Sequence, residues 1–327
     1  MRFGITCNWL HGMAMLMLPL VVSVSLFCSD VALSADADSA KIAFYSEIGA
    51  SAAEIFTMNI DGTGLQKLTT NSVIDICPAF SRDGLRIAFS SKRSGNVELY
   101  IMDRNGDNPV RLTNTAYGEY QPDWSVSDTS IVFTRYFTSV TWDYGEIYVI
   151  RADGTGERRL TNNPADDMRP TWSPDGTKIM FNSKRDGNYE IYIMNPDGSN
   201  QQRLTDTPGA EMGPRYSPDG TKISYALIDF QTFKGEIHVM NADGTGDMTL
   251  TNAGGASESV VWSPDGTKIV FQSNRTGNFD IFIMNADGSN QTNLTNSTAN
   301  DYWPSWGIAI PVSVEQQSWG GIKNQFR

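Results

Sequence analysis

Apolar and polar residues alternate along most of this chain in short runs, rather than at the spacing of an amphipathic helix. The segment "TKIMFNS" (177–183) alternates in this way, and "YEIYIMN" (189–195) follows it closely. Both patterns predict half-buried strands. The tetrapeptides "SPDG" (173–176) and "NPDG" (195–198) supply proline at the second turn position and glycine where positive φ is needed. The pattern therefore predicts an all-β protein of antiparallel strands joined by tight turns.

The same arrangement of strands and turns recurs in copies of roughly 45 residues, a period typical of propeller blades. One aromatic residue marks the first strand of each copy: Phe80, Trp124, Trp172, Tyr216, Trp262 and Trp306. Large rings bury roughly 150–250 Å² each, so we interpret these residues as packing between neighbouring blades. Each copy is predicted to hold four antiparallel strands. The repeat thus predicts a six-bladed β-propeller.

The two ends of the repeat region complement one another. The segment "KIAFYS" (41–46) corresponds to a second strand without a first, and "WPSWG" (303–307) to a first strand without a second. We therefore expect the C-terminal strand to complete the N-terminal blade. Such closure leaves no open sheet edge between the two ends.

The repeat "PTWSPDGTKIMFNSKRDGNYEIYIMNPDGSNQQRLT" (170–205) resembles the repeats of the TolB-type β-propeller family, over residues 41–307. The resemblance implies a periplasmic propeller that binds partner proteins, notably a peptidoglycan-associated lipoprotein, in envelope maintenance. Full family members carry an α/β domain ahead of the propeller, which contacts an inner-membrane partner. Because only residues 35–40 separate the expected cleavage point from the first strand, that contact is not expected here.

The N-terminal residues 1–34 are predicted to be a signal peptide. Arg2 precedes the uncharged apolar run 13–28, and Ala32 and Ser34 fit a cleavage site after Ser34. Residues 35–40 are then a linker and 308–327 a C-terminal tail. The prediction is a periplasmic or secreted protein with no membrane span after cleavage; an uncleaved anchor is the alternative.

Charge and cysteine content narrow the possible partners. The net charge of −12 argues against nucleic acid and anionic membranes, and favours cations or basic partners. Cys77 is the only cysteine after residue 34, so no internal disulfide is expected in the exported chain.

His238 is the only histidine after the predicted cleavage site. It occupies a position that is aromatic in the other copies, so we expect it to replace a packed ring. Its counterparts are Phe56, Tyr100, Tyr148, Tyr192 and Phe282. No G-x-S-x-G elbow occurs, and the repeated "SPDG" aspartates are explained by turns. We predict a protein-binding scaffold without enzymatic activity or catalytic residues. The alternatives are a carbohydrate-active propeller resembling oligogalacturonide lyases, weakened by the scarcity of histidine for a metal, and a binder of wall glycan.

Acidic residues precede the first strand of each copy. Each lies three residues before a proline, except in the sixth blade, where Glu258 is the nearest acid. We predict that they form a ring at the mouth of the central channel: Asp75, Glu119, Asp167, Glu211, Glu258 and Asp301. Such a ring would favour a cation, possible calcium binding included, or a basic partner. The alternative is solvated loop carboxylates with no ligand.

The connections that leave the second strand of each copy differ in sequence, and binding residues tend to occupy such variable loops. Blades three and five carry the aromatic candidates Tyr136, Phe137, Trp142, Tyr144, Phe230 and Phe233. Blades two, four and six carry the arginines Arg93, Arg185 and Arg275. Aromatic residues and arginines are typical anchors of protein interfaces. Packing of the aromatic residues on their own blades is the alternative.

Overall fold

The computed structural model describes residues 39–309, apart from 48, 50–51, 138–143 and 253. The predicted signal peptide, the linker residues before Ser39, Trp142 and most of the predicted tail lie outside these residues. The described part belongs to one compact unit, Asp36–Arg327. It contains no helix long and apolar enough to cross a membrane.

Four strand positions repeat around the ring. The inner strands are β4 (Asp75–Phe80), β8 (Gly118–Trp124), β12 (Asp167–Trp172), β16 (Ala210–Tyr216), β20 (Ser257–Trp262) and β24 (Asp301–Gly307). The second strands are β5 (Arg86–Ser91), β9 (Ser130–Tyr136), β13 (Ile179–Ser183), β17 (Lys222–Asp229), β21 (Lys268–Ser273) and β1 (Lys41–Glu47). The third strands are β6 (Glu98–Asp103), β10 (Gly145–Arg151), β14 (Glu190–Met194), β18 (Lys234–Asn241), β22 (Asp280–Asn285) and β2 (Ala53–Asn59). The outer strands are β7 (Val110–Arg111), β11 (Arg158–Arg159), β15 (Gln202–Arg203), β19 (Met248–Thr249), β23 (Thr292–Asn293) and β3 (Gln66–Lys67).

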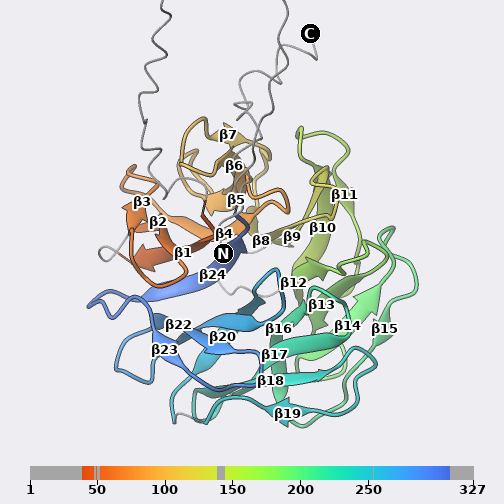
Figure 1. The fold of residues 1–327 in the computed structure, drawn as a ribbon. Coiled ribbons are helices and arrows are strands. Elements are labelled where there is room, and N and C mark those ends of the chain that lie inside the picture. The colour runs from red at the N-terminus through yellow and green to blue at the C-terminus, as the bar shows by residue number, and fades with distance from the viewer. Residues whose placement is uncertain (1–38, 48, 50–51, 138–143, 253, 310–327) are drawn as a thin grey trace, which may run out of the picture. The chain divides into compact units, whose positions relative to one another are not determined.

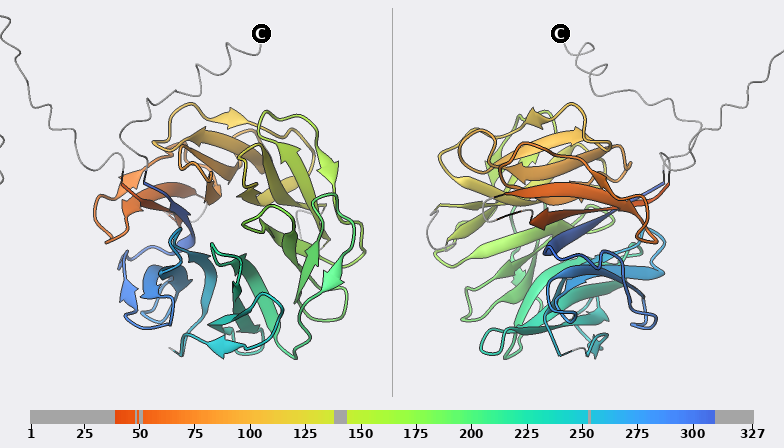
Figure 2. Two further views of the ribbon diagram at one scale, coloured as in Figure 1. Left: turned by 45° about the vertical axis from the view of Figure 1, so that its right-hand side comes forward. Right: turned by 90° about the vertical axis from the view of Figure 1, so that its left-hand side faces the viewer.

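These strands form six four-stranded antiparallel sheets arranged in a ring, which confirms the predicted propeller (Figure 1). Figure 2 shows the ring with the inner strands around the centre. The C-terminal strand β24 pairs with β1, with Trp306 opposite Ile42. The predicted closure of the ring is therefore confirmed, and the first blade has the strand order β24-β1-β2-β3.

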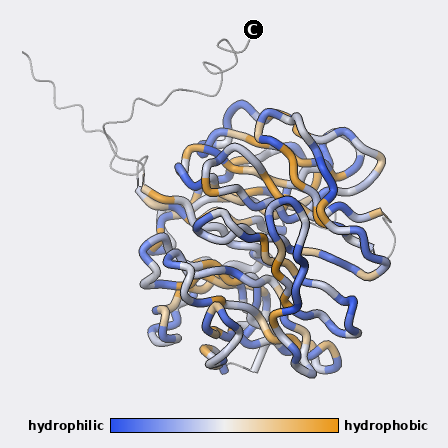
Figure 3. The backbone as a smooth tube through the Cα atoms, turned by 90° about the vertical axis from the view of Figure 1, so that its right-hand side faces the viewer, coloured by the Kyte–Doolittle hydropathy of each residue, from blue (hydrophilic) through white to orange (hydrophobic). Residues whose placement is uncertain are grey.

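The hydrophobic core of the described part is divided among the contacts between blades. Each main cluster combines buried side chains from two neighbouring sheets, as Trp124 of blade three does with Ala79 and Leu99 of blade two. Trp172 packs in the same way against Val132 and Ile147 of blade three. The repeated aromatic residue thus packs between blades, as expected. Hydrophobic segments follow the strands, and hydrophilic ones gather on outer connections (Figure 3).

A bulge interrupts every inner strand at the residue before the proline position. The pairing register shifts there in all six sheets, for example between Met168 and Thr171. The residue before the proline position has a positive φ in each blade: Cys77, Gln121, Arg169, Gly213, Ser259 and Trp303. Only one of these six is glycine, although a left-handed backbone is costly for other residues. The bulge turns these positions toward the central channel, where all but Cys77 line one small cavity of about 20 Å³.

Candidate functional site

The predicted acidic ring is arranged differently from the open ring that the sequence suggested. Five of the six residues begin or nearly begin an inner strand, and all five are buried: Asp75, Glu119, Asp167, Glu211 and Asp301. Asp75 accepts a hydrogen bond from Arg93 at 2.9 Å, and Asp167 one from Arg185 at 2.8 Å. These carboxylates are buried among polar partners and are not solvated at the channel mouth. The reason is that the inner strand starts beneath the neighbouring connection, which supplies polar partners.

Glu258 does not share the position of the other five acids. Ser257 pairs with Ser273 just as Asp167 pairs with Ser183, so serine takes the acidic position in blade six. Glu258 is one residue out of step, and its carboxylate lies 3.9 Å from the guanidinium of Arg169. It therefore belongs to the central channel.

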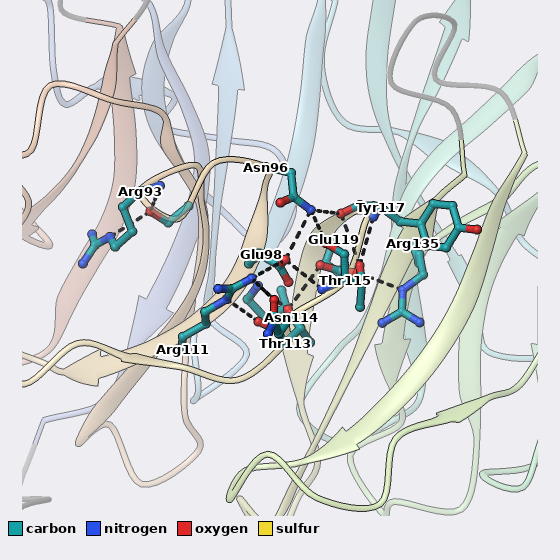
Figure 4. A network of polar contacts seen from close by, with 12 residues as sticks. Arg93, Asn96, Glu98, Arg111, Thr113, Asn114, Thr115, Tyr117, Glu119 and Arg135 are labelled. Atoms are coloured by element: carbon teal, nitrogen blue, oxygen red, sulfur yellow. Dashed lines mark hydrogen bonds and ion pairs between the residues drawn. The ribbon is translucent and has the colours of Figure 1, made fainter.

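Neighbouring carboxylates form buried pairs between blades, as Figure 4 shows for Glu98 and Glu119. The Glu119 carboxylate accepts hydrogen bonds from Thr113 Oγ1 at 3.2 Å and from Arg135 Nε at 2.8 Å. Glu98 accepts one from Arg111 at 2.6 Å. Burial, together with the nearby Glu98 carboxylate, raises the pKa of Glu119 to about 7.

The pairing recurs at other contacts between blades. Glu211 lies beside Glu190, and burial raises the pKa of Glu211 to about 7. Burial likewise raises the pKa of Asp167 to about 6, with the charge of Glu146 adding to the effect. The described residues contain no group of three acidic, histidine or cysteine side chains that could hold a metal ion. A cation at these carboxylates would have to displace arginine or hydroxyl partners, and calcium binding stays a prediction of the sequence.

The three predicted partner-binding arginines lie within the blades. Arg93 covers the rings of Phe89 and Tyr100, each at 5.0 Å. Arg185 and Arg275 repeat this stacking in blades four and six. Half-buried guanidiniums held by ring stacking and hydrogen bonds have little freedom to meet a partner. These contacts give the arginine the same structural role in blades two, four and six.

Two of the predicted aromatic residues line a deep pocket on the face of variable connections. Tyr136 is buried and Phe137 is half-buried in its wall. We call this hollow of about 650 Å³ the tyrosine pocket. Blades one, two and three share its lining, in which the aromatic residues are Tyr45, Tyr117, Tyr120, Tyr136 and Phe137. The sequence missed Tyr45, Tyr117 and Tyr120, which lie on the end of β1, the connection after β7 and the strand β8.

Polar contacts fix the wall of the tyrosine pocket (Figure 4). The side-chain amide of Asn96 donates to the backbone oxygens of Thr115 at 2.6 Å and Tyr117 at 2.7 Å. The Tyr117 ring meets Phe137 edge-on at a centroid distance of 4.8 Å, and its residue is 41% exposed. Thr115 is held in turn by Glu98 and Glu119. The buried acids therefore support a rigid, exposed aromatic edge.

The other predicted aromatic residues are exposed. Tyr144 is exposed just before β10 of blade three, and Phe230 and Phe233 are exposed between β17 and β18. The ring centroids of Phe230 and Tyr189 lie 6.2 Å apart. Phe230 also lines a second hollow of about 550 Å³, mostly formed by blade five. The structure does not bring these residues into the tyrosine pocket. The same loop-rich face therefore holds two separate apolar hollows.

His238 fills an aromatic position, as the repeat predicts. Its ring lies 5.5 Å from that of Tyr225, matching the ring pairs of the other blades. His238 Nδ1 lies 3.0 Å from Asp247 Oδ2, and Thr249 Oγ1 lies 3.3 Å from Nε2.

We expect the substitution His238→Phe to change the free energy of unfolding by less than about 1.5 kcal/mol, because phenylalanine fills this position in other blades. Asp247 keeps its hydrogen bond from Tyr225 and is half exposed. Denaturant unfolding measures the effect, with His238→Ala as the control that removes the ring. Equal destabilisation by both variants would contradict a packing role.

The architecture defines a class of protein: a six-bladed β-propeller, here with two hollows between its variable connections. Residues 20–141, 136–207 and 188–309 match the model of the TolB beta propeller domain. The chain therefore belongs to this family.

Known proteins match shorter stretches of the chain, and they include two that are named TolB. The chain is 43% identical over 61 residues to the Tol-Pal system protein TolB of Desulfosudis oleivorans, which is 19% of this chain and 14% of that protein. It is 42% identical over 50 residues to the protein TolB homolog of Chlorobium luteolum, 15% of this chain and 12% of that protein. An uncharacterized protein of Agrobacterium fabrum is 32% identical over 87 residues, 27% of this chain and 30% of that protein. The matches thus span less than a third of each relative's length.

Solved structures share the fold. TolB from Acinetobacter baumannii has a TM-score of 0.74 at 22% identity, covering 83% of this chain and 67% of that chain. Kuenenia stuttgartiensis hydrazine synthase has a TM-score of 0.72 at 16% identity, covering 83% of this chain and 47% of that chain. At these identities the likeness shows the fold alone. The lyase alternative gains no support from these relatives.

Proposed function

We propose that this chain is an exported, non-enzymatic scaffold that binds a partner protein through the tyrosine pocket. The tyrosine pocket itself carries the proposal, because its lining belongs to three blades and a partner would close it. Tyrosine combines apolar area with a polar end and few rotatable bonds, which suits protein recognition. Family membership supports a Tol-Pal-like role in the cell envelope, and the partner that the family suggests is a peptidoglycan-associated lipoprotein.

The fixed wall of the tyrosine pocket supports the proposal, because little conformational entropy would be lost when a partner binds. Asn96 fixes the connection that carries Tyr117, and Phe137 packs against the Tyr117 ring. A preformed site loses less conformational entropy on association than a mobile loop does. We therefore expect an apolar or aromatic partner side chain to insert beside Tyr117 and Phe137.

The proposal predicts that Tyr117→Ala combined with Phe137→Ala weakens partner binding. Removal of central aromatic anchors commonly costs 2 kcal/mol or more, which is roughly a 30-fold loss of affinity. The full chain would be used to capture proteins from an envelope extract, and a captured partner would be titrated against both forms.

The matched control is Leu65→Ala, since Leu65 is 61% exposed and does not line the tyrosine pocket. It should capture the partner as the unmodified chain does. Unchanged capture by the double variant would contradict the proposed anchor. Retention of wall polysaccharide without a protein would favour glycan binding instead.

A further inference from the structure

The turn-bearing face holds a separate site, a funnel of about 310 Å³ at the opposite mouth of the channel. The "SPDG" turns and their counterparts surround it. The rim is the residue that follows the aromatic position by two, taken from each blade: Arg82, Val126, Pro174, Pro218, Pro264 and Ile308. Five of these six side chains are apolar. Arg82 is the only charged member of the rim.

Below the rim, the funnel is lined by one residue position whose side chain differs from blade to blade, although the surrounding strands and turns repeat. The residue before each aromatic position lines the funnel and differs in every blade: Ala79, Asp123, Thr171, Arg215, Val261 and Ser305. The aromatic positions around them repeat because each blade needs the same packing. A floor that departs from the repeat in every copy is typical of a recognition surface held on a rigid scaffold.

The rim and floor together carry a surplus of positive charge. Arg215 Nη1 lies 3.0 Å from Asp123 Oδ1, and Arg82 Nη2 lies 3.8 Å from Asp123 Oδ2. These three are the charged residues of the funnel lining in the described chain, so two guanidiniums share one carboxylate. The side chain of Arg82 is 47% exposed and that of Arg215 is 25% exposed. Both therefore retain access for a further anionic group.

The funnel has a closed floor. Arg169 lies over the Trp303 ring at 4.7 Å, and the cavity that these two residues line together with Arg215 holds only about 20 Å³. Arg215 bonds to Asp123 across the channel, from blade five to blade three. A ligand that enters from the turn-bearing face therefore ends at the guanidiniums and does not pass through.

The aspartates of the turns around the funnel are held in place by their own bonds. Asp175 accepts a hydrogen bond from the serine hydroxyl of its own turn at 2.6 Å, and Asp219 accepts the equivalent bond at 2.5 Å. Each also accepts a backbone N–H of the same turn. Asp128 accepts the backbone N–H groups of Arg82 and Asp83. The acidic outer border thus leaves the basic centre available.

We propose that this funnel binds the C-terminal carboxylate of a peptide whose last side chain is apolar. The carboxylate pairs with Arg82 and Arg215, which present the planar donors that carboxylates prefer. The apolar side chain packs against the proline rim and the indoles of Trp172, Trp262 and Trp306 in the wall. This site lies on the other face from the tyrosine pocket and does not depend on the function proposed there.

The test uses N-acetyl-Ala-Leu-Phe as the free acid and as its C-terminal amide. Each is titrated into the full chain while tryptophan fluorescence is followed, because three indoles line the funnel. We expect the acid to change the fluorescence and to bind at least about ten times more tightly than the amide, since only the acid forms a charge-assisted bidentate pair. Equal affinity, or no binding of either peptide, would overturn the proposal.

Two variants test the geometry, and exposed positions keep the fold intact. Arg82→Gln should bring the affinity for the acid close to that for the amide, and Val126→Asp should reduce it further by repelling the carboxylate at the rim. Arg151→Gln is the matched control, since Arg151 is exposed and outside the funnel lining. Unchanged preference for the acid in Arg82→Gln would also overturn the proposal.

Discussion

Replacement of Trp124 by alanine is expected to lower the free energy of unfolding by about 3–5 kcal/mol, the range typical of large aromatic residues in cores. Trp124 is 1% exposed and packs between blades two and three. Its indole N–H donates to Ala79 O at 3.0 Å, and Arg86 lies over its ring at 4.5 Å. The loss combines burial, a cavity and a broken hydrogen bond.

Denaturant or thermal unfolding measures this change. For a domain of this size each kcal/mol lowers the melting temperature by about 2–4 °C, so a fall of roughly 6–20 °C is expected. A melting temperature equal to that of the unmodified chain would show that blade contacts do not depend on this residue.

A matched pair of conservative variants separates packing from hydrogen bonding. Trp124→Phe loses the bond to Ala79, whereas the buried Trp172 Nε1 has no hydrogen-bond partner among the described residues. Trp124→Phe should therefore cost more than Trp172→Phe, by about 1 kcal/mol. Equal costs would contradict a contribution from the indole hydrogen bond.

The stability of the propeller is expected to fall as the pH rises from about 5 to about 8. Burial raises the pKa of Glu119 and of Glu211 to about 7, and that of Asp167 to about 6, above ordinary values near 4. The folded state then binds protons more tightly than the unfolded chain. The stabilisation is complete below the unfolded pKa values and is lost as the pH rises through the folded ones.

The expected effect is a loss of several kcal/mol. Each unit of pKa difference corresponds to about 1.4 kcal/mol. The paired Glu98 does not offset this loss. Despite burial, hydrogen bonds with Glu119, Thr113, Thr115 and Arg111 hold its pKa below the ordinary value, so its own contribution changes only below about pH 5. The turn aspartates such as Asp175 have lowered pKa values and act only at still lower pH. The loss is therefore expected to fall almost entirely between about pH 5 and about pH 8.

Glu119→Gln should flatten this pH profile, since the amide has no charge to bury. Urea unfolding at a series of pH values measures it. Glu157→Gln is the matched control, because Glu157 also binds Arg135, at 2.8 Å, but is one-third exposed. The control should keep the slope of the unmodified chain. A profile that rises from pH 5 to pH 8, or one that Glu119→Gln leaves unchanged, would contradict the buried-acid explanation.

The local pattern was sufficient to predict the blades. Alternation of apolar and polar residues identifies strands, and "SPDG" with its proline and glycine identifies turns, because both depend on neighbours within a few residues. The repeated aromatic position and the unmatched ends at 41–46 and 303–307 then imply six packed blades and a closed ring. His238 was placed correctly by the same comparison, since its position is aromatic in the other copies.

The local pattern gave the wrong surroundings for the acids and arginines. Asp167 and Arg185 were both predicted at the surface. In the structure Arg185 Nη2 lies 2.8 Å from Asp167 Oδ2, and Asp167 is fully buried. Alternation tells which side of a strand a residue occupies, but not which side chain of another strand or connection lies against it. The backbone before the prolines is a second case: local preference favours an extended conformation, whereas Arg169 and Trp303 have positive φ.

The sequence by itself determined the strands, the turns, the number of blades and the closure of the ring, because these follow from short-range periodicity repeated along the chain. Only the tertiary structure decided which carboxylates are buried, which arginines are stacked, and where hollows open. The tyrosine pocket joins Tyr45 of blade one to Phe137 of blade three, and the funnel brings Asp123 and Arg215 together across the channel. Such sites depend on contacts between residues far apart in the chain, which periodicity does not specify.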